Sequence, residues 1–346
     1  MTFGGRNRGG TGTYARSLQF ALEERRDLEL EVIEAEGRGL PATLDWLLRG
    51  ARRRLRDAQV ELLHCPAVVA PWNLPGPFVV TIHDHSSKLF PADHPAEWRA
   101  YEDWFLPARA RAAARVITGT RFARDQLVGD LGIDPGRVAV TPYGVDPTFH
   151  RAGGQRPPAN PRRPPRLLFP GAPAARKNLE QALSALASAA PGGRLAAAVL
   201  QISGATEADF PGHADAIRRM GLTRRVHWLG QIPPARMPAL VALADVVVYP
   251  SRYEGFGFPA VEAMAAGTPL VASSAACLPE VVADGGLLVD PDDVEGLRQA
   301  LESVLDDPAL ADRLSAAGRS RAGTFTWQRC AALTVEVYRE ALATSR

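Results

Sequence analysis

Short apolar runs separated by amphipathic stretches repeat along most of the chain. The first half predicts strands at residues 28–33, 60–64, 78–83, 115–118 and 138–141, with helices between them, for example at 13–24 and 122–131. The second half predicts strands at residues 166–170, 197–203, 226–229, 246–250, 270–273 and 286–289. Short strands that alternate with helices predict parallel sheets covered on both faces. Right-handed crossovers then make each half a doubly wound α/β domain.

The boundary between the two predicted domains is a segment rich in proline and glycine. Residues 151–165 read RAGGQRPPANPRRPP and show no apolar period, which is typical of an interdomain linker. We therefore expect an amino-terminal domain at residues 1–150 and a second domain at 166–325. A last helix within 326–346 is expected to pack back across the domains.

The start of the first domain departs from this pattern. A doubly wound domain normally opens with a strand, but here the Gly-rich segment GGTGTYARSL at residues 9–18 begins almost at Met1. Three explanations stay open: the coding start lies further upstream, the strand has been lost, or it is supplied from elsewhere. We therefore expect the first domain to lack its first strand.

Composition narrows the class of protein. The 346 residues are 46% hydrophobic and 23% charged, as in a globular protein. Forty Lys and Arg against 38 Asp and Glu disfavour a nucleic-acid binder. Cys65, Cys277 and Cys330 are odd in number and far apart, which fits a reducing cytoplasm. Because the sequence shows neither a bilayer-spanning apolar run nor a signal peptide, we expect a cytoplasmic protein.

Residues 249–269, YPSRYEGFGFPAVEAMAAGTP, carry the strongest chemical signal. A predicted strand leads into a Gly-rich loop that holds Glu254, and Pro259 suits the first turn of the helix that holds Glu262. Open α/β sheets bind ligands beyond the carboxyl ends of their strands. Gly255 and Gly257 let the backbone approach a ligand, and a helix N-terminus favours a pyrophosphate. The two carboxylates then suit sugar hydroxyls. In the alternative interpretation, Glu254 caps the loop and Glu262 is solvated.

This string closely resembles the signature of retaining glycosyltransferases of family 4, in which two glutamates are separated by seven residues. Residues 171–183 (GAPAARKNLEQAL), 79–95 (VVTIHDHSSKLFPADHP) and 9–18 resemble further regions of that family. Among the subgroups of this family, the sequence most resembles the bacterial mannosyltransferase-like enzymes of surface-polysaccharide assembly. The resemblance implies the GT-B fold, in which two Rossmann-like domains face each other across a cleft.

The resemblance also implies roles for individual residues. Glu262 would hold the ribose hydroxyls and Glu254 would face the donor sugar. Arg176 and Lys177 would neutralise the departing pyrophosphate. Because these two cations would take the part of a divalent metal, we expect metal independence, and the nucleotide sugar is a substrate rather than a cofactor. Many family members carry Arg where this chain has Ala172. The implied donor-binding residues are Gly10, Thr11, Gly12, Gly171, Arg176, Lys177, Gly230, Glu254, Gly255, Phe256, Gly257, Val261 and Glu262.

Two further features concern catalysis and location. By resemblance, His83 would line the cleft and join Glu254, Arg176 and Lys177 as a catalytic residue, through a hydrogen bond or proton transfer. A histidine at a strand end is otherwise often a core or capping residue. A basic cluster is formed by Arg49, Arg52, Arg53, Arg54 and Arg56. It is either a solvated helix face or a contact with an anionic membrane carrying a lipid-linked acceptor.

The function that these observations predict is retaining transfer of a hexose from a nucleoside diphosphate sugar to a saccharide or lipid-linked hydroxyl acceptor in cell-surface polysaccharide or glycoconjugate synthesis. The subgroup resemblance favours GDP-mannose as the donor, with UDP- and dTDP-sugars as alternatives. A non-catalytic nucleotide-sugar-binding protein, and a GT-B epimerase or phosphorylase, are the competing hypotheses. The sequence does not specify the acceptor, the linkage or the oligomeric state.

Overall fold

The structure is a computed structural model that describes residues 9–33, 50–58, 60–72, 74, 76–155 and 163–344. The chain divides into two compact units, Met1–Gly144 with Thr326–Arg346, and Val145–Phe325. We call them the first and the second unit and describe each by itself.

The described residues of the first unit form a parallel sheet of four strands in the order β1-β2-β3-β4. Each strand pairs with the next in parallel, for example Val80 opposite Val116 and Ile117 opposite Ala139. The helices, 3-10 helices and strands among its described residues are α1 Gly10–Glu23, α3 Ala51–Ala58, β1 Leu63–Cys65, β2 Phe78–Thr81, α4 Ser86–Leu89, η2 Pro91–Asp93, α5 Ala96–Trp104, α6 Leu106–Ala112, β3 Arg115–Thr118, α7 Arg121–Leu131, η3 Pro135–Arg137, β4 Val138–Val140 and α17 Trp327–Ala343.

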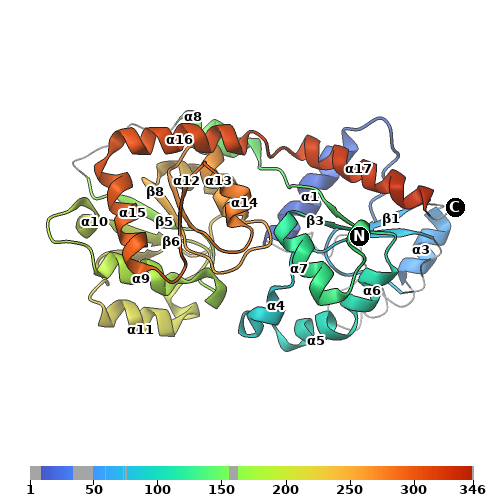
Figure 1. The fold of residues 1–346 in the computed structure, drawn as a ribbon, viewed down its shortest axis with the longest axis horizontal. Coiled ribbons are helices and arrows are strands. Elements are labelled where there is room, and N and C mark those ends of the chain that lie inside the picture. Colours follow the sequence, from blue (N-terminus) through green and yellow to red (C-terminus); the bar gives the residue numbers. More distant parts are fainter. Residues whose placement is uncertain are drawn as a thin grey trace. The chain divides into compact units, whose positions relative to one another are not determined.

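The core of the first unit lies on both faces of this sheet. On one face, Val80 and Val116 pack with Leu106, Leu127 and other buried side chains of α6 and α7. On the opposite face, Val79 and Ile117 pack against α17. The last helix, which also contacts α1, is therefore part of the first unit although it is last in the sequence (Figure 1).

One predicted strand of the first unit is wrong. Residues 28–33 form no strand, because no described strand pairs with them. The other four predicted strands of this half appear as β1 to β4 with ends shifted by at most three residues. The alternation of polar and apolar residues at 27–32 is that of a strand, so what the segment lacks is a neighbour rather than a suitable sequence.

The second unit contains a parallel sheet of six strands in the order β10-β9-β8-β5-β6-β7. Its helices, 3-10 helices and strands are α8 Pro147–Gly154, β5 Arg166–Phe169, η4 Ala175–Lys177, α9 Leu179–Ala187, α10 Arg194–Ala197, β6 Val199–Ile202, η5 Glu207–Asp209, α11 Pro211–Arg219, β7 Val226–Trp228, η6 Pro234–Arg236, α12 Met237–Leu243, β8 Val246–Tyr249, α13 Phe258–Ala265, β9 Leu270–Ser273, α14 Leu278–Val282, β10 Leu287–Val289, α15 Val294–Asp306 and α16 Pro308–Ala322. All six strands predicted for this half are present.

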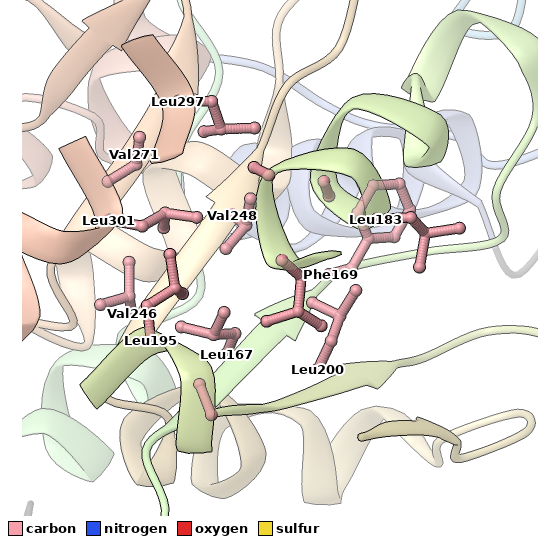
Figure 2. Packing of buried hydrophobic residues seen from close by; sticks show 14 of the residues in the cluster. Leu167, Phe169, Leu183, Leu195, Leu200, Val246, Val248, Val271, Leu297 and Leu301 are labelled. Atoms are coloured by element: carbon pink, nitrogen blue, oxygen red, sulfur yellow. The ribbon is translucent and has the colours of Figure 1, made fainter. Parts of the chain in front are cut away.

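The core of the second unit is built from short apolar strands and amphipathic helices. Figure 2 shows Leu167, Phe169, Val246 and Val248 of the central strands facing leucines of α9, α10 and α15. On the other side, α8, α12, α13 and α16 pack against one another. Central strands buried on both faces explain why β5 and β8 are almost wholly apolar.

The segment between the predicted domains is only partly described. Residues 151–154 form the end of α8, whose amino terminus is capped by Asp146 with its carboxylate 2.8 Å from the Thr148 amide. Residues 156–162, the middle of the predicted linker, lie outside the described residues. The division into compact units falls at residues 144 and 145, ahead of this helix.

Candidate active site

The sheet of the second unit has a topological switch point. From β5 the chain continues to β6 and then β7 in one direction, and β8, β9 and β10 follow on the other side of β5. The segments that leave the carboxyl ends of β5 and β8 therefore diverge to opposite faces of the sheet. Ligands of open α/β sheets bind in the crevice at such a point. Arg176 and Lys177 follow β5, and Glu254 follows β8.

At this switch point, two cations surround one carboxylate. The Arg176 guanidinium donates a hydrogen bond of 2.7 Å from Nη1 to Oε1 of Glu254. Lys177 Nζ lies 3.1 Å from the same oxygen. Arg176 also donates to the backbone carbonyl of Tyr253, at 3.2 Å. Two positive charges against one negative charge leave the cluster cationic, which suits an anionic ligand.

A buried tyrosine completes the cluster. Lys177 Nζ donates to the hydroxyl of Tyr249 at 3.1 Å and lies 4.8 Å from the centre of its ring. Tyr249 ends β8 and is fully buried, while Lys177 and Glu254 are each 8% exposed. Lys177 is thus a buried cation held by a carboxylate, a hydroxyl and an aromatic ring.

Burial and the neighbouring charges set the ionisation of the cluster. Burial alone raises the pKa of Glu254, but the charges of Lys177 and Arg176 outweigh it and hold that pKa at about 2. Burial lowers the pKa of Lys177, and Glu254 opposes that effect. Burial and the charge of Glu254 raise the pKa of Tyr249 far above its ordinary value. Glu254 is therefore ionised and Tyr249 is neutral at pH 7.

Amide side chains fix the loop that carries the two cations. Asn178 has a left-handed backbone (φ 58°), and its amide donates to the carbonyls of Pro250 and Pro291 at 3.2 and 2.8 Å. Gln181 donates to the carbonyls of Asp290 and Asp293 at 2.9 and 3.0 Å. These bonds join the segments after β5, β8 and β10, so Arg176 and Lys177 sit on a rigid support.

Glycines line the carboxyl ends of three neighbouring strands. Gly171, Gly204 and Gly230 follow β5, β6 and β7, and all three have positive φ. A Cβ on Gly204 would lie 2.9 Å from the Ala172 nitrogen, so only glycine fits there. The Gly204 amide donates to the Gly230 carbonyl at 2.8 Å. The three glycines form a rim at one edge of the sheet. Two of them, Gly171 and Gly230, are predicted donor-binding residues.

The loop after β8 leads into α13, as the motif predicted. Gly257 precedes this helix with φ 82°, and a Cβ there would lie 2.9 Å from Leu278. Gly255 and Phe256 are buried in the same loop, and the Phe256 ring meets Phe258 edge-on at 5.2 Å. Val261 is fully buried in the first turns of α13, so its side chain belongs to the core.

Glu262 behaves differently from Glu254. It lies one residue beyond Val261 on α13, where the protein covers most of its surface. Burial raises the pKa of Glu262 to about 7, Lys177 opposes that shift, and Asp146 adds to it. The two glutamates of the motif thus differ by several pH units in their affinity for a proton, although both face Lys177.

The predicted residues of the first unit form a group of their own. Gly10, Thr11 and Gly12 make the first turn of α1, three residues earlier than the helix predicted at residue 13. Tyr14, on the next turn, meets the His83 ring edge-on at 4.9 Å and bonds Thr81 at 3.0 Å. This contact brings the start of α1 and His83 to the carboxyl edge of the sheet.

Both ring nitrogens of His83 have partners. Nε2 lies 3.2 Å from the carbonyl of Pro66, which can only accept, so Nε2 carries the proton. Nδ1 therefore accepts from the Tyr143 hydroxyl at 2.8 Å. Burial lowers the pKa of His83 to about 4, with Asp84 opposing. His83 is a neutral imidazole of defined tautomer at pH 7.

Several features of the site were not predicted from the sequence. Tyr249, Asn178, Gln181 and Gly204 hold the cluster or its rim, and Tyr143 orients His83. The basic cluster lies on α3, where Arg52, Arg53, Arg54 and Arg56 are exposed, while Arg49 lies outside the described residues. No helix of the described residues is long and apolar enough to cross a bilayer.

The two parallel α/β sheets are those of the GT-B glycosyltransferase fold. The solved sucrose-phosphate synthase of Thermosynechococcus elongatus has this fold, with a TM-score of 0.78 and 23% identity over 97% of this chain and 94% of that one. Two family models match the sequence, Glycosyltransferase Family 4 over residues 8–149 and Glycosyl transferases group 1 over residues 155–321. The chain belongs to glycosyltransferase family 4.

Two curated relatives narrow the comparison. O-antigen chain mannosyltransferase B of Escherichia coli is 28% identical over 82% of this chain and 76% of its own length. The MMP alpha-(1->4)-mannosyltransferase of Mycolicibacterium hassiacum is 33% identical over 77% of this chain and 66% of its own length. The predicted family, fold class and glycosyl transfer are thereby confirmed.

Proposed function

We propose that this glycosyltransferase transfers mannose from GDP-mannose to a hydroxyl acceptor, with retention at the anomeric carbon and without a metal ion. The observation that carries the proposal is the cationic cluster of Arg176 and Lys177 at the switch point of the second unit, held by Glu254 and Tyr249. The names of the two mannosyltransferase relatives support the choice of sugar.

The cluster supplies the charge stabilisation that the reaction needs. As the bond from the anomeric carbon to the phosphate oxygen breaks, negative charge grows on the departing diphosphate. Arg176 and Lys177 neutralise that charge from positions fixed before the reaction, so little reorganisation is required. This pair of cations takes the part that a divalent metal plays in other transferases.

The remaining residues position the donor. The Gly171–Gly204–Gly230 rim lets the backbone approach the donor closely, and Glu262 accepts hydrogen bonds from the ribose hydroxyls. Glu254 accepts from the sugar hydroxyls. The acceptor hydroxyl attacks from the face that the diphosphate leaves, and a phosphate oxygen takes its proton. Neutral His83 orients a substrate hydroxyl through a hydrogen bond from Nε2 that replaces its 3.2 Å bond to the Pro66 carbonyl, rather than by charge.

Nucleotide-dependent stabilisation tests the donor site. GDP at about 100 times its dissociation constant is expected to add roughly 2.7 kcal/mol to the free energy of unfolding. UDP and dTDP are the comparison ligands. Glu262→Ala should reduce the shift, whereas Glu336→Ala, which removes an exposed carboxylate of α17, should not. A larger shift with UDP would show that the donor carries uracil rather than guanine. No shift with any of the three nucleotides would contradict the proposed donor site.

Stereochemistry and metal dependence are tested on the product. Proton NMR of the first-formed glycoside should show the anomeric configuration of the donor, with the same rate in excess EDTA. A product of opposite configuration, or activity restored by Mg²⁺ or Mn²⁺ after chelation, would contradict the mechanism. Binding of donor with no transfer to any saccharide or lipid-linked acceptor would instead support a non-catalytic binding protein.

The basic helix α3 supports a contact with an anionic membrane. Ala51 and Leu55 are buried, and four arginines of α3 are exposed. Each basic side chain near an anionic surface contributes about 1 kcal/mol to binding. Flotation with phosphatidylglycerol vesicles should therefore be salt-sensitive and should be lost when the four arginines are changed to Gln. Absence of binding at low salt would remove the membrane from the proposal.

A further inference from the structure

The loop that follows β1 contains a strained turn at Val68. The φ of this residue is 61°, in the left-handed region. Among the described residues, four other than glycine have positive φ, and Val68 is the β-branched one of these. For such a side chain a positive φ is a genuine outlier, because Cβ comes too close to the following carbonyl oxygen. The Val69 amide donates to the Ala67 carbonyl across Val68, which closes a γ-turn of the rare, strained kind.

Buried contacts hold this turn on its inner side. The Val68 amide donates to the carbonyl of Thr81, at the end of β2, at 2.9 Å. The side chains of Val68 and Val69 are 6% and 4% exposed, and they belong to two different core clusters. A backbone in a sparsely populated region persists only where its surroundings over-determine it. The two valines supply that constraint from within the core.

The outer end of the same loop is tied to His83. His83 Nε2 donates to the carbonyl of Pro66 at 3.2 Å, two residues before Val68, and Tyr143 holds the other ring nitrogen at 2.8 Å. Pro66 and His83 are partly exposed whereas Val68 is buried, so a substrate can reach this bond. One hydrogen bond contributes about as much stability as a strained residue costs. Exchange of this one bond can therefore decide whether the turn stays strained.

We propose that residues 66–69 form a latch that His83 keeps closed, and that the latch opens when a substrate hydroxyl replaces the Pro66 carbonyl on Nε2. This inference rests on the proposed function, in which His83 binds such a hydroxyl. Opening returns Val68 to a negative φ, and the strain that is released adds to the binding of the acceptor. A group that cannot accept a hydrogen bond from Nε2 leaves the latch closed, so the latch selects for a hydroxyl.

Paired variants measure the strain without any substrate. Val68→Ala and Val69→Ala remove the same two methyl groups from buried positions, so they are matched. Val68→Gly should unfold about 3 °C above Val68→Ala, because glycine adopts positive φ without strain. Val69→Gly should unfold about 2 °C below Val69→Ala, because glycine there adds only chain entropy. Tryptophan fluorescence follows the first unit, which holds five of the six tryptophans.

Variants of His83 test whether its bond keeps the latch closed. In the His83→Ala background the loop should relax, so Val68→Gly and Val68→Ala should unfold within about 1 °C of each other. His83→Gln keeps an N–H donor near the position of Nε2 and should preserve the full difference of about 3 °C. A difference that persists with His83→Ala, or that is absent when His83 is intact, would overturn the proposal.

Transfer to octyl α-mannoside, used as the acceptor probe, tests whether substrate opens the latch. Val68→Gly should raise KM for the mannoside about 5-fold over Val68→Ala with kcat unchanged, because no strain remains to be released on binding. The two Val69 variants should share one KM. Equal KM values in the Val68 pair would overturn the coupling to substrate. The unfolding measurements need no substrate, and nucleotide binding to the second unit needs no loop variant, so the latch and the proposed function can fail separately.

Discussion

The carboxyl ends of the two sheets carry different kinds of polar group. In the second unit, Lys177, Arg176 and Glu254 form a cluster of full charges. In the first unit, His64 and His83 are hydrogen-bonded to tyrosine and threonine hydroxyls and to a carbonyl. Burial lowers the pKa of His64 to about 3 and that of His83 to about 4, so both are neutral at pH 7.

This difference indicates a division of labour. Under the proposed function, the net positive, buried cluster attracts and stabilises a diphosphate, because charges interact more strongly away from water. A neutral network of defined tautomers can orient a hydroxyl group without competing for the same anion. The donor chemistry is therefore expected to depend steeply on charge in the second unit, whereas the first unit is expected to depend on hydrogen-bond geometry.

Removing one cation should have the largest effect. Lys177→Met keeps the length of the side chain and should lower the transfer rate by about 1,000-fold, the loss that follows removal of one stabilising group from a transition state. Lys88→Met is the matched control, since Lys88 is the other lysine of the sequence and is exposed. Steady-state kinetics with circular dichroism as a fold check would decide. If Lys177→Met turned over at the wild-type rate, the charge cluster would have no part in the mechanism.

Lowering the pH should destabilise the first unit next. Both histidines bind protons more weakly when folded than when unfolded, where their pKa is about 6.5. Stability is therefore full above pH 6.5 and is lost as the pH falls toward 4. We expect a loss on the order of 4 kcal/mol between pH 7 and 5, about 2 kcal/mol from each histidine, measured by amide exchange in β2. NMR titration of either imidazole with an ordinary pKa would contradict this expectation.

Much of the second unit could be predicted from sequence because its signals are local. Every strand there is a short apolar run, and the Gly-Phe-Gly-Phe-Pro string places the loop and the start of α13. Tyr249, Asn178 and Gln181 could not be predicted, since their roles depend on contacts across 72 to 113 residues of sequence. The composition also pointed to Lys177: the chain has many arginines but only two lysines, and Lys177 is one of them.

The first unit was harder to predict because its strands depend on neighbours. Residues 28–33 have the alternation of a strand, yet pairing decides whether they form one. The catalytic role predicted for His83 stays a prediction. The sequence could not show that Tyr143 and Pro66 bind the two ring nitrogens of His83. Local pattern predicts elements, whereas strand order and buried hydrogen bonds require the tertiary fold.

Raising the pH should destabilise the second unit through Glu262. Its pKa of about 7 when folded exceeds the ordinary value of 4.5, so the folded state holds its proton more tightly. Stability is therefore full below pH 4.5 and is lost as the pH rises through 7. The wild type should lose on the order of 2 kcal/mol of stability between pH 5 and pH 8, and Glu262→Gln should abolish this loss. Urea denaturation at the two pH values measures both. Glu336→Gln should leave the wild-type profile unchanged, and a flat wild-type profile would refute the shift.

Removing single hydroxyls in the first unit should have the smallest effect and gives the finest test of His83. Tyr143→Phe removes the donor to His83 Nδ1, and Tyr338→Phe removes the corresponding partner of His64 Nδ1, 2.6 Å away. Each should cost about 1 kcal/mol of stability, the usual contribution of one hydrogen bond. Both are measured by urea denaturation and by the transfer rate.

The pair separates a role in the reaction from a role in folding. The two variants lose the same group from the same unit, so a purely structural histidine predicts equal stabilities and equal rates. If His83 orients a substrate hydroxyl, freeing its ring should lower the transfer rate of Tyr143→Phe several-fold below that of Tyr338→Phe at matched stability. Nitrogen NMR should still show the proton on Nε2, because the Pro66 carbonyl accepts it in both variants. Equal rates would leave the neutral network as a structural feature and place the polar chemistry of transfer in the second unit.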